Sequence, residues 1–283
     1  MAVVDLHLHT TASDGRLAPA ELVRLVVQRG LRVVAITDHD STEGLAEALE
    51  TARSYPQLTV IPGIELSVDV PGNEIHLLGY FIDSRDQSFQ EQLARFRASR
   101  EERARAMVQR LAELGLPVEW ERVKELAGDG AIGRPHIALA MVERSYISSP
   151  QEAFAEYIGR NGPAYVERHK LVPTQAVELL LSVGGFPVLA HPAEVQDLAR
   201  VLDELQEAGL VGMEVFYASY PPERTRELLA LATQRALLPC GGSDYHAMST
   251  PGEPLPGEVG PPIEVAYQLL TRAKARERAV DTA

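Results

Sequence analysis

The sequence predicts an α/β fold in which parallel strands alternate with helices and a helical segment is inserted between them. Short apolar runs rich in β-branched residues alternate with amphipathic runs at helical spacing. His, Asp and Glu follow several of the apolar runs, and no run between residue 86 and about 160 has a strand pattern. These three observations are typical of a parallel α/β barrel or sheet that carries a helical insertion.

Local signals define each element. The helix expected at 19–30 has Pro19 near its start and Gly30 at its end, and the helix at 41–53 opens on Ser41 or Thr42 as its cap. The other elements expected in the first half are strands at 3–10, 32–40 and 58–68, the last with its end near Glu65, and a hairpin over 67–82 that turns at Pro71, Gly72 and Asn73. Those expected in the second half are a long helix over 87–114, shorter helices to 159, strands at 185–192, 210–216 and 236–246, and a last helix over about 263–278.

The chain is long enough for one large domain with an insertion. It has 283 residues, of which 45% are hydrophobic. We expect a first barrel part at 1–95, a helical cap at 96–163 and a second barrel part at 164–283.

Composition excludes several classes of protein. No apolar run approaches the roughly 20 residues of a membrane span, and the N-terminus lacks the pattern of a signal peptide. The lone Cys240 rules out an internal disulfide framework and fits a reducing cytoplasm. The net charge of −13 disfavours long nucleic acid as a partner, unless bound cations or a basic patch reverse the field. The sequence does not determine the oligomeric state.

A His-x-His pair lies in the first expected strand. His7 and His9 point the same way because alternate strand residues share a face. Two adjacent imidazoles are half of a metal site, and Asp14 in the following Ser-Asp-Gly turn can add an oxygen. On its own the motif also fits two histidines on a solvated sheet face.

Further His, Asp and Glu residues are expected at other strand ends, where α/β folds place their sites. Six of the eight histidines belong to this set. The nine candidate ligands are His7, His9, Asp14, His39, Glu65, His76, His191, Asp244 and His246. Mixed imidazole and carboxylate ligands in this number suit two or three divalent ions of Mn, Zn or Fe type, with Mg less favoured.

The motifs DLHLHTTASDG, ITDHD, GIE, AHP and GSDYH, together with His76, resemble the PHP (polymerase and histidinol phosphatase) superfamily of metal-dependent phosphoesterases. The resemblance implies a distorted (βα)7 PHP barrel with up to three metals at its C-terminal face. One metal would be held by His7, His9, Glu65 and Asp244, a second by Glu65, His76 and His191, and a third by Asp14, His39 and His246. Asp14 or a histidine of the metal shell, such as His191, would give a proton to the leaving group.

The insertion is similar to that of a bacterial subgroup that removes the 3′-phosphate from nucleoside 3′,5′-bisphosphates, and whose relatives trim short RNA from the 5′ end. That similarity implies that Arg97, Arg100, Arg134 and His136 hold substrate phosphate, beside Asp14 and His39. Arg suits this role because it binds phosphate through two hydrogen bonds. A solvated charged helix face is the alternative for the arginines, and a plain helix start for 133–136. Arg168 and His169 follow the insertion, and a place near the site and a plain loop are equally open for them.

We therefore expect a phosphoesterase acting on a small phosphorylated substrate, a nucleotide or short oligonucleotide. Two alternatives stay open from the sequence. One is a PHP phosphatase for another phosphomonoester, such as histidinol phosphate, and the other is a non-catalytic metal-bound scaffold.

Overall fold

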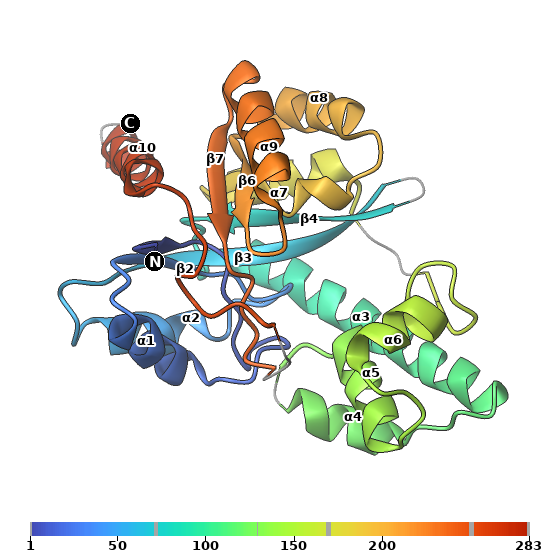
Figure 1. Cartoon of the computed structure of the whole chain (residues 1–283). Coiled ribbons are helices and arrows are strands. Elements are labelled where there is room, and N and C mark those ends of the chain that lie inside the picture. Colours follow the sequence, from blue (N-terminus) through green and yellow to red (C-terminus); the bar gives the residue numbers. More distant parts are fainter. Residues whose placement is uncertain (1, 71–72, 129, 168–170, 249–251, 282–283) are drawn as a thin grey trace.

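The computed structural model describes residues 2–70, 73–128, 130–167, 171–248 and 252–281 (Figure 1). The strands are β1 (Val4–Asp5), β2 (Val33–Ile36), β3 (Thr59–Val70), β4 (Asn73–Tyr80), β5 (Phe186–Leu189), β6 (Gly212–Tyr217) and β7 (Leu238–Gly242). The α-helices are α1 (Pro19–Gln28), α2 (Leu45–Ala52), α3 (Gln87–Glu113), α4 (Trp120–Ala127), α5 (Arg134–Glu143), α6 (Pro150–Ala153), α7 (Pro173–Ser182), α8 (Leu198–Ala208), α9 (Pro222–Gln234) and α10 (Ile263–Asp281). The structure also has a π-helix, η1 (Phe154–Ile158), and a 3₁₀ helix, η2 (Pro192–Glu194).

The strands form one sheet in chain order that curls into a nearly closed barrel. Neighbouring strands are parallel except at β4, which runs antiparallel to both β3 and β5. Hydrogen bonds then join the first strand to the last: Leu6 N donates to Gly241 O at 3.1 Å, and Asp244 N donates to His7 O at 2.9 Å. A Cβ on Gly242 would lie 2.4 Å from His7 N, so this close approach requires glycine.

The expected alternation of strands and helices is confirmed, with three local errors. The first strand, expected over 3–10, covers only Val4–Asp5, because it pairs with β2 at these two residues alone, so His7 and His9 follow it. The third strand does not end near Glu65 but continues to Val70, because the antiparallel β4 pairs with it along its length. The cap of α2 is Gly44 rather than Ser41 or Thr42, since the loop after β2 takes three further residues to reach the helix. The turn predicted at Pro71 and Gly72 lies outside the described residues.

Successive residues of β2 are buried in two different cores. Val33 and Ala35 pack with α10, whereas Val34 and Ile36 pack in the larger core that includes residues of α1, α2 and α7 to α9. This follows from the period of two in a strand that is covered on both faces. No helix within the described ranges is both long and apolar enough to cross a membrane.

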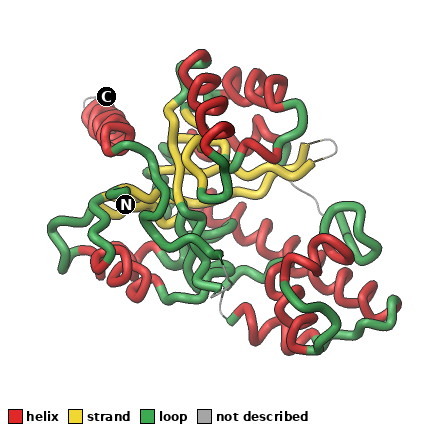
Figure 2. The backbone as a smooth tube through the Cα atoms, viewed as in Figure 1, coloured by secondary structure: helices red, strands yellow, loops and turns green. Residues whose placement is uncertain are grey.

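A third core lies in the helical segment. Met107 and Leu111 of α3 pack there with Val123 of α4 and Ile137 of α5. The first half of α3 belongs to the barrel instead, through Phe89. Figure 1 shows α4, α5 and α6 gathered beside the far end of α3, and Figure 2 shows loops crowded between the strands and these helices. The boundary at residue 96 stays a prediction, and α3 runs through it as one continuous helix.

Candidate metal centre and substrate pocket

The nine predicted ligands converge where the barrel faces the helical segment. Their positions are as follows: His7, His9 and Asp14 follow β1, His39 follows β2, Glu65 and His76 lie within β3 and β4, His191 follows β5, and Asp244 and His246 follow β7. Eight of them form three overlapping groups, within each of which the ligand atoms lie no more than 4.8 Å apart. His191, predicted to share a metal with Glu65 and His76, belongs to none of these groups, and His39 stands in its place.

The first group is His7, His9, Glu65 and Asp244. Nε2 of His9 lies 3.0 Å from Asp244 Oδ1 and 3.3 Å from Glu65 Oε2. Nε2 of His7 lies 3.2 Å from both of these carboxylate oxygens. Two imidazole nitrogens and two carboxylate oxygens that converge in this way match the donor set of a transition-metal site.

Glu65 also belongs to the second group, with His39 and His76. Its Oε1 lies 2.8 Å from His76 Nδ1 and 3.4 Å from His191 Nε2, and its Oε2 lies 3.1 Å from His39 Nδ1. The two oxygens of one carboxylate therefore face different sets of imidazoles. This is the geometry of a ligand that can bridge two cations.

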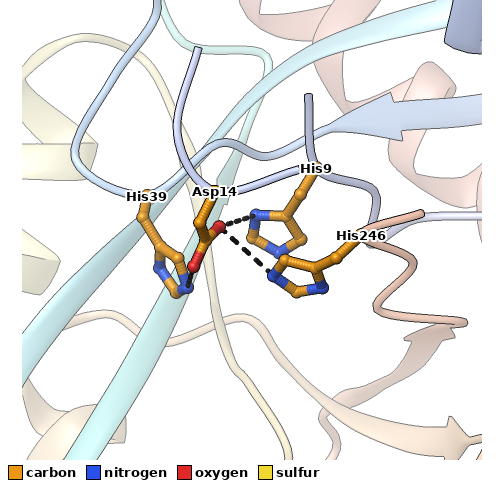
Figure 3. Close-up of side chains that lie close together, drawn as sticks. All are labelled: His9, Asp14, His39 and His246. Carbon is orange, nitrogen blue, oxygen red and sulfur yellow. Dashed lines mark ion pairs between the residues drawn. The ribbon is translucent and has the colours of Figure 1, made fainter. Parts of the chain in front are cut away.

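The third group surrounds Asp14 (Figure 3). Its carboxylate lies 3.3 Å from His246 Nε2 and 3.8 Å from both His9 Nδ1 and His39 Nε2. His9 thus faces the first group with one ring nitrogen and the third with the other.

Burial and charge act against each other throughout this cluster. Burial disfavours the charged form of Asp14, but His246 and His39 outweigh it and hold the Asp14 pKa well below its usual value. Burial likewise opposes protonation of His246, yet Asp14 raises the pKa of this ring to about 10. For His39 burial prevails and lowers the pKa to about 3.

The residues present fit bound divalent cations. Within the described chain, His9 Nε2, His39 Nδ1 and Glu65 Oε1 are buried without a well-formed hydrogen bond. Buried polar atoms without such partners are costly, and metal coordination satisfies them. Three carboxylates beside six imidazoles also leave net negative charge once the rings are neutral, which is the state in which they bind metal.

Two residues that the sequence analysis did not single out hold the ligands in place. Glu214, fully buried on β6, accepts a hydrogen bond from His7 Nδ1 at 3.1 Å and another from His191 N at 2.9 Å. His7 Nε2 is thereby left to face the cluster. Tyr217 donates its hydroxyl to Asp244 Oδ2 at 2.7 Å. An acidic residue inside the apolar run GMEVF was the available signal for Glu214, whereas nothing in the sequence distinguishes Tyr217.

Three residues at the site have left-handed backbone. Asp40, His191 and Asp244 have φ of 49°, 29° and 54°. Such conformations cost non-glycine residues energy and often mark functional sites. Two of the three are predicted ligands, and the third contacts a predicted substrate-binding residue.

A pocket of about 190 Å³ joins the cluster to the helical segment. Four predicted ligands line it, Asp14, His39, His76 and His246, and so do Arg100, Arg103 and Arg134. Arg100 donates from Nε to Asp40 Oδ2 at 2.5 Å and from Nη2 to Ser67 Oγ at 2.6 Å. The Arg134 guanidinium lies 5.5 Å from the centre of the Phe154 ring. Arg103 was not among the predicted residues, although it shares a helix face with Arg100.

The other predicted substrate-binding residues lie nearby. Arg97 donates to Asp40 O at 3.2 Å and pairs with Glu43 at 3.3 Å, and it is not among the described residues that line the 190 Å³ pocket. His136 accepts a hydrogen bond from Gly133 N at 3.0 Å, and burial lowers its pKa. It lines a separate pocket of about 220 Å³, which Asp14 and Arg16 also border. Arg168 and His169 lie outside the described residues.

Comparison with known sequences identifies the family. The PHP domain model matches residues 5–111. The 5′-3′ exoribonuclease Rnm of Escherichia coli (strain K12) is 36% identical over 249 residues, which cover 86% of this chain and 85% of that protein. The chain belongs to the PHP family. The 3′,5′-nucleoside bisphosphate phosphatase of Chromobacterium violaceum is 33% identical over 266 residues, 89% of each chain.

Solved structures of PHP relatives share the fold. A chain from Bifidobacterium adolescentis, assigned as a metal-dependent phosphoesterase, aligns with a TM-score of 0.86 at 31% identity and covers 95% of this chain and 96% of that one. An amidohydrolase from Chromobacterium violaceum with bound sulfate and no metal aligns with a TM-score of 0.87 at 28% identity, over 96% and 97% of the two chains. The predicted PHP barrel is confirmed. This PHP protein is a hydrolase of phosphoester bonds, and its clusters indicate divalent metal binding.

Proposed function

We propose that this PHP protein removes the 3′-phosphate from nucleoside 3′,5′-bisphosphates in a metal-dependent hydrolysis. The observation that carries the proposal is the 190 Å³ pocket, which brings three arginines to the edge of the ligand cluster. A substrate with two phosphates can place one at the cluster and the other against the guanidinium groups. Arg binds phosphate through charge-assisted, often paired hydrogen bonds. The bisphosphate phosphatase relative from Chromobacterium violaceum supports the same substrate class.

The nine predicted ligands would hold two or three divalent ions of Mn, Zn or Fe type. Such ions, when bound, neutralise phosphoryl oxygens and lower the pKa of water. The chain itself orients the phosphate and supplies proton carriers. Asp14 lines the pocket at the edge of the cluster, but its lowered pKa keeps it ionised and suited to metal binding, so His191 is the one of the two predicted proton carriers that is proposed to protonate the leaving 3′ oxygen.

The phosphate that is not cleaved is proposed to bind on the side of the helical segment, to Arg100, Arg103 and Arg134. Arg100 is already oriented by Asp40 and Ser67, so little side-chain freedom is lost when a phosphate binds. Arg97 and His136, which were also predicted to bind phosphate, keep a supporting role in this proposal. Arg97 pairs with Glu43 beside Arg100, and His136 lines the neighbouring pocket.

A second activity has its own support. The exoribonuclease Rnm of Escherichia coli is 36% identical to this chain, so hydrolysis of short RNA from a 5′-phosphorylated end is the second candidate. The 5′-terminal nucleotide of such RNA carries a 5′-phosphate and a 3′-phosphodiester, and it therefore presents the same two groups as a nucleoside bisphosphate.

A substrate panel tests the proposal, with release of inorganic phosphate measured for the phosphomonoesters and release of nucleoside 5′-phosphate measured for the oligoribonucleotide. The panel contains adenosine 3′,5′-bisphosphate, adenosine 5′-monophosphate, histidinol phosphate and a 5′-phosphorylated oligoribonucleotide, each with Mn²⁺ and with chelator. We expect the bisphosphate to have the highest kcat/KM among the monoesters and chelator to abolish turnover. A preference for histidinol phosphate would contradict the bisphosphate assignment. Absence of turnover on every substrate would favour the metal-bound scaffold.

A further inference from the structure

A larger pocket borders the ligand cluster at another edge. It has a volume of about 810 Å³ and lies between the end of β6, the start of α9 and the segments that follow β7. Phe216, Tyr217 and Tyr220 line it, and Asp244 is the predicted ligand that it shares with the cluster. Among the described residues, this aromatic pocket has no lining residue in common with the basic 190 Å³ pocket. A phosphate bound at the cluster can therefore carry two substituents, one that extends into the basic pocket and one that extends into the aromatic pocket.

The aromatic wall is held rigidly. The Tyr217 hydroxyl is bound to Asp244, and the Tyr220 hydroxyl accepts a hydrogen bond from Ala193 N at 3.0 Å. The two rings lie 5.0 Å apart, measured between centroids, at an angle of 50°. Because both hydroxyls are engaged, the rings are fixed beside the pocket, and a planar aromatic group can pack on them without an ordering cost.

We infer that this aromatic pocket binds the nucleobase of a second nucleotide, attached through its 5′ oxygen to the phosphate that is cleaved. The inference rests on the proposed function and assigns a base-binding site to its second candidate activity, the hydrolysis of phosphodiesters. Aromatic side chains bind bases of single-stranded nucleic acid by stacking, largely independent of sequence. The pocket also falls within the size range of typical small-ligand sites.

The chemical step is the same for both substrates. The oxygen of water bonds to phosphorus, the bond from phosphorus to the 3′ oxygen of the first nucleotide breaks, and that oxygen takes up a proton. A bisphosphate yields inorganic phosphate and a nucleoside 5′-phosphate. A 5′-phosphorylated dinucleotide yields two nucleoside 5′-phosphates, because the second nucleoside keeps the phosphate on its 5′ oxygen. The arginines hold the first nucleotide's 5′-phosphate in both cases.

The first test removes the base from the substrate rather than a side chain from the protein. We would measure kcat/KM with Mn²⁺ for 5′-phosphorylated ApA and for the same molecule with an abasic second nucleotide. A stacked base is worth roughly a 5- to 150-fold advantage, so ApA should be hydrolysed at least about five times more efficiently. Equal kcat/KM values would overturn the inference, and so would hydrolysis of the bisphosphate without hydrolysis of ApA.

Variants then locate the base. Tyr220→Leu should remove the advantage of ApA over its abasic analogue and change kcat/KM for adenosine 3′,5′-bisphosphate less than about twofold. Tyr220→Phe keeps the ring and loses the hydrogen bond from Ala193, so the advantage should persist. Ala218→Trp narrows the pocket from an exposed position, which protects the fold, and should lower hydrolysis of ApA but not of the bisphosphate.

The outcomes separate the two proposals. Loss of activity on ApA and on the bisphosphate to the same extent in both Tyr220→Leu and Ala218→Trp would overturn the base pocket and leave the proposed function standing. A wild-type protein that hydrolyses neither substrate would overturn the proposed function and the inference together.

Discussion

The two sides of the candidate site are held by different means. On the barrel side, ligands from six strand regions converge, and the side chains of His7 and His9 have no exposed surface. A buried carboxylate, Glu214, fixes two segments of this side. On the helical side, Arg100 and Arg134 come from two helices and are held by Asp40, Ser67 and the Phe154 ring. The barrel side therefore presents carboxylates and imidazoles, which accept hydrogen bonds or bind metal, and the helical side presents guanidinium groups, which donate hydrogen bonds.

This difference explains why a substrate with two phosphates suits the site. Carboxylates and neutral imidazoles repel an anion unless cations neutralise them, so the barrel side can hold phosphate when metal is bound. The guanidinium groups attract phosphate directly. Substitutions on the two sides should therefore have separable effects, on metal binding for the barrel and on substrate preference for the helices.

The largest effect is expected from His9→Ala, because His9 faces two of the three ligand groups. Metal affinity should fall by more than the roughly 10- to 100-fold that loss of an outer-shell partner costs, and turnover should nearly vanish. Elemental analysis and isothermal titration with Mn²⁺ measure this. His136→Ala is the matched control, since His136 lies outside the three groups and should keep full metal content. Full metal content in His9→Ala would remove His9 from the ligand set.

Glu214→Gln tests the support beneath the barrel side. The amide keeps the shape of the carboxylate but holds the His7 ring less strongly, so metal affinity should fall about 10- to 100-fold with little change in secondary structure. Titration calorimetry measures the affinity, and circular dichroism checks the fold. Glu227→Gln, on the exposed face of α9, is the control and should bind metal like wild type. Unchanged affinity in Glu214→Gln would mean that His7 needs no support from β6.

Arg134→Ala should leave metal binding intact and weaken use of a nucleoside 3′,5′-bisphosphate by about 1.5–3 kcal/mol, roughly a ten- to hundredfold loss in kcat/KM. An aryl phosphate lacks the second phosphate, so its turnover should change much less. Equal losses on the two substrates would place Arg134 at the phosphate that is cleaved instead.

Arg97→Ala sharpens the same comparison and should have the smallest effect. Arg97 is paired with Glu43 and is partly exposed, so a loss below about threefold is expected, on the scale of a surface ion pair. A loss for Arg97→Ala as large as that for Arg134→Ala would show that the phosphate reaches beyond the 190 Å³ pocket.

The barrel side could be predicted from the sequence because its ligands have strong local signals. His7 and His9 follow an apolar run, and His39 and Asp244 stand in short polar motifs at strand ends. Tyr217 lacks such a signal. Its supporting role depends on its distance to Asp244, which is set by how β6 and β7 pair. Sequence spacing alone does not give that register.

The helical side was harder to predict for a related reason. Arg97, Arg100 and Arg103 share one helix face, yet their surroundings differ. Arg100 and Arg103 are buried where α3 packs against the barrel. Arg97 lies one turn earlier in the helix and is partly exposed beside Glu43. A helical period shows which residues share a face, but it does not show which part of that face packs against the barrel.

The most direct test of the central claim compares adenosine 3′,5′-bisphosphate with adenosine 3′-monophosphate, which differ by the 5′-phosphate alone. With Mn²⁺ present, kcat/KM for the bisphosphate should exceed that for the monophosphate by about tenfold or more, and Arg103→Ala or Arg134→Ala should reduce this ratio toward one. Equal kcat/KM for the two nucleotides in the wild-type protein would contradict the account, because the arginines would then not recognise a second phosphate.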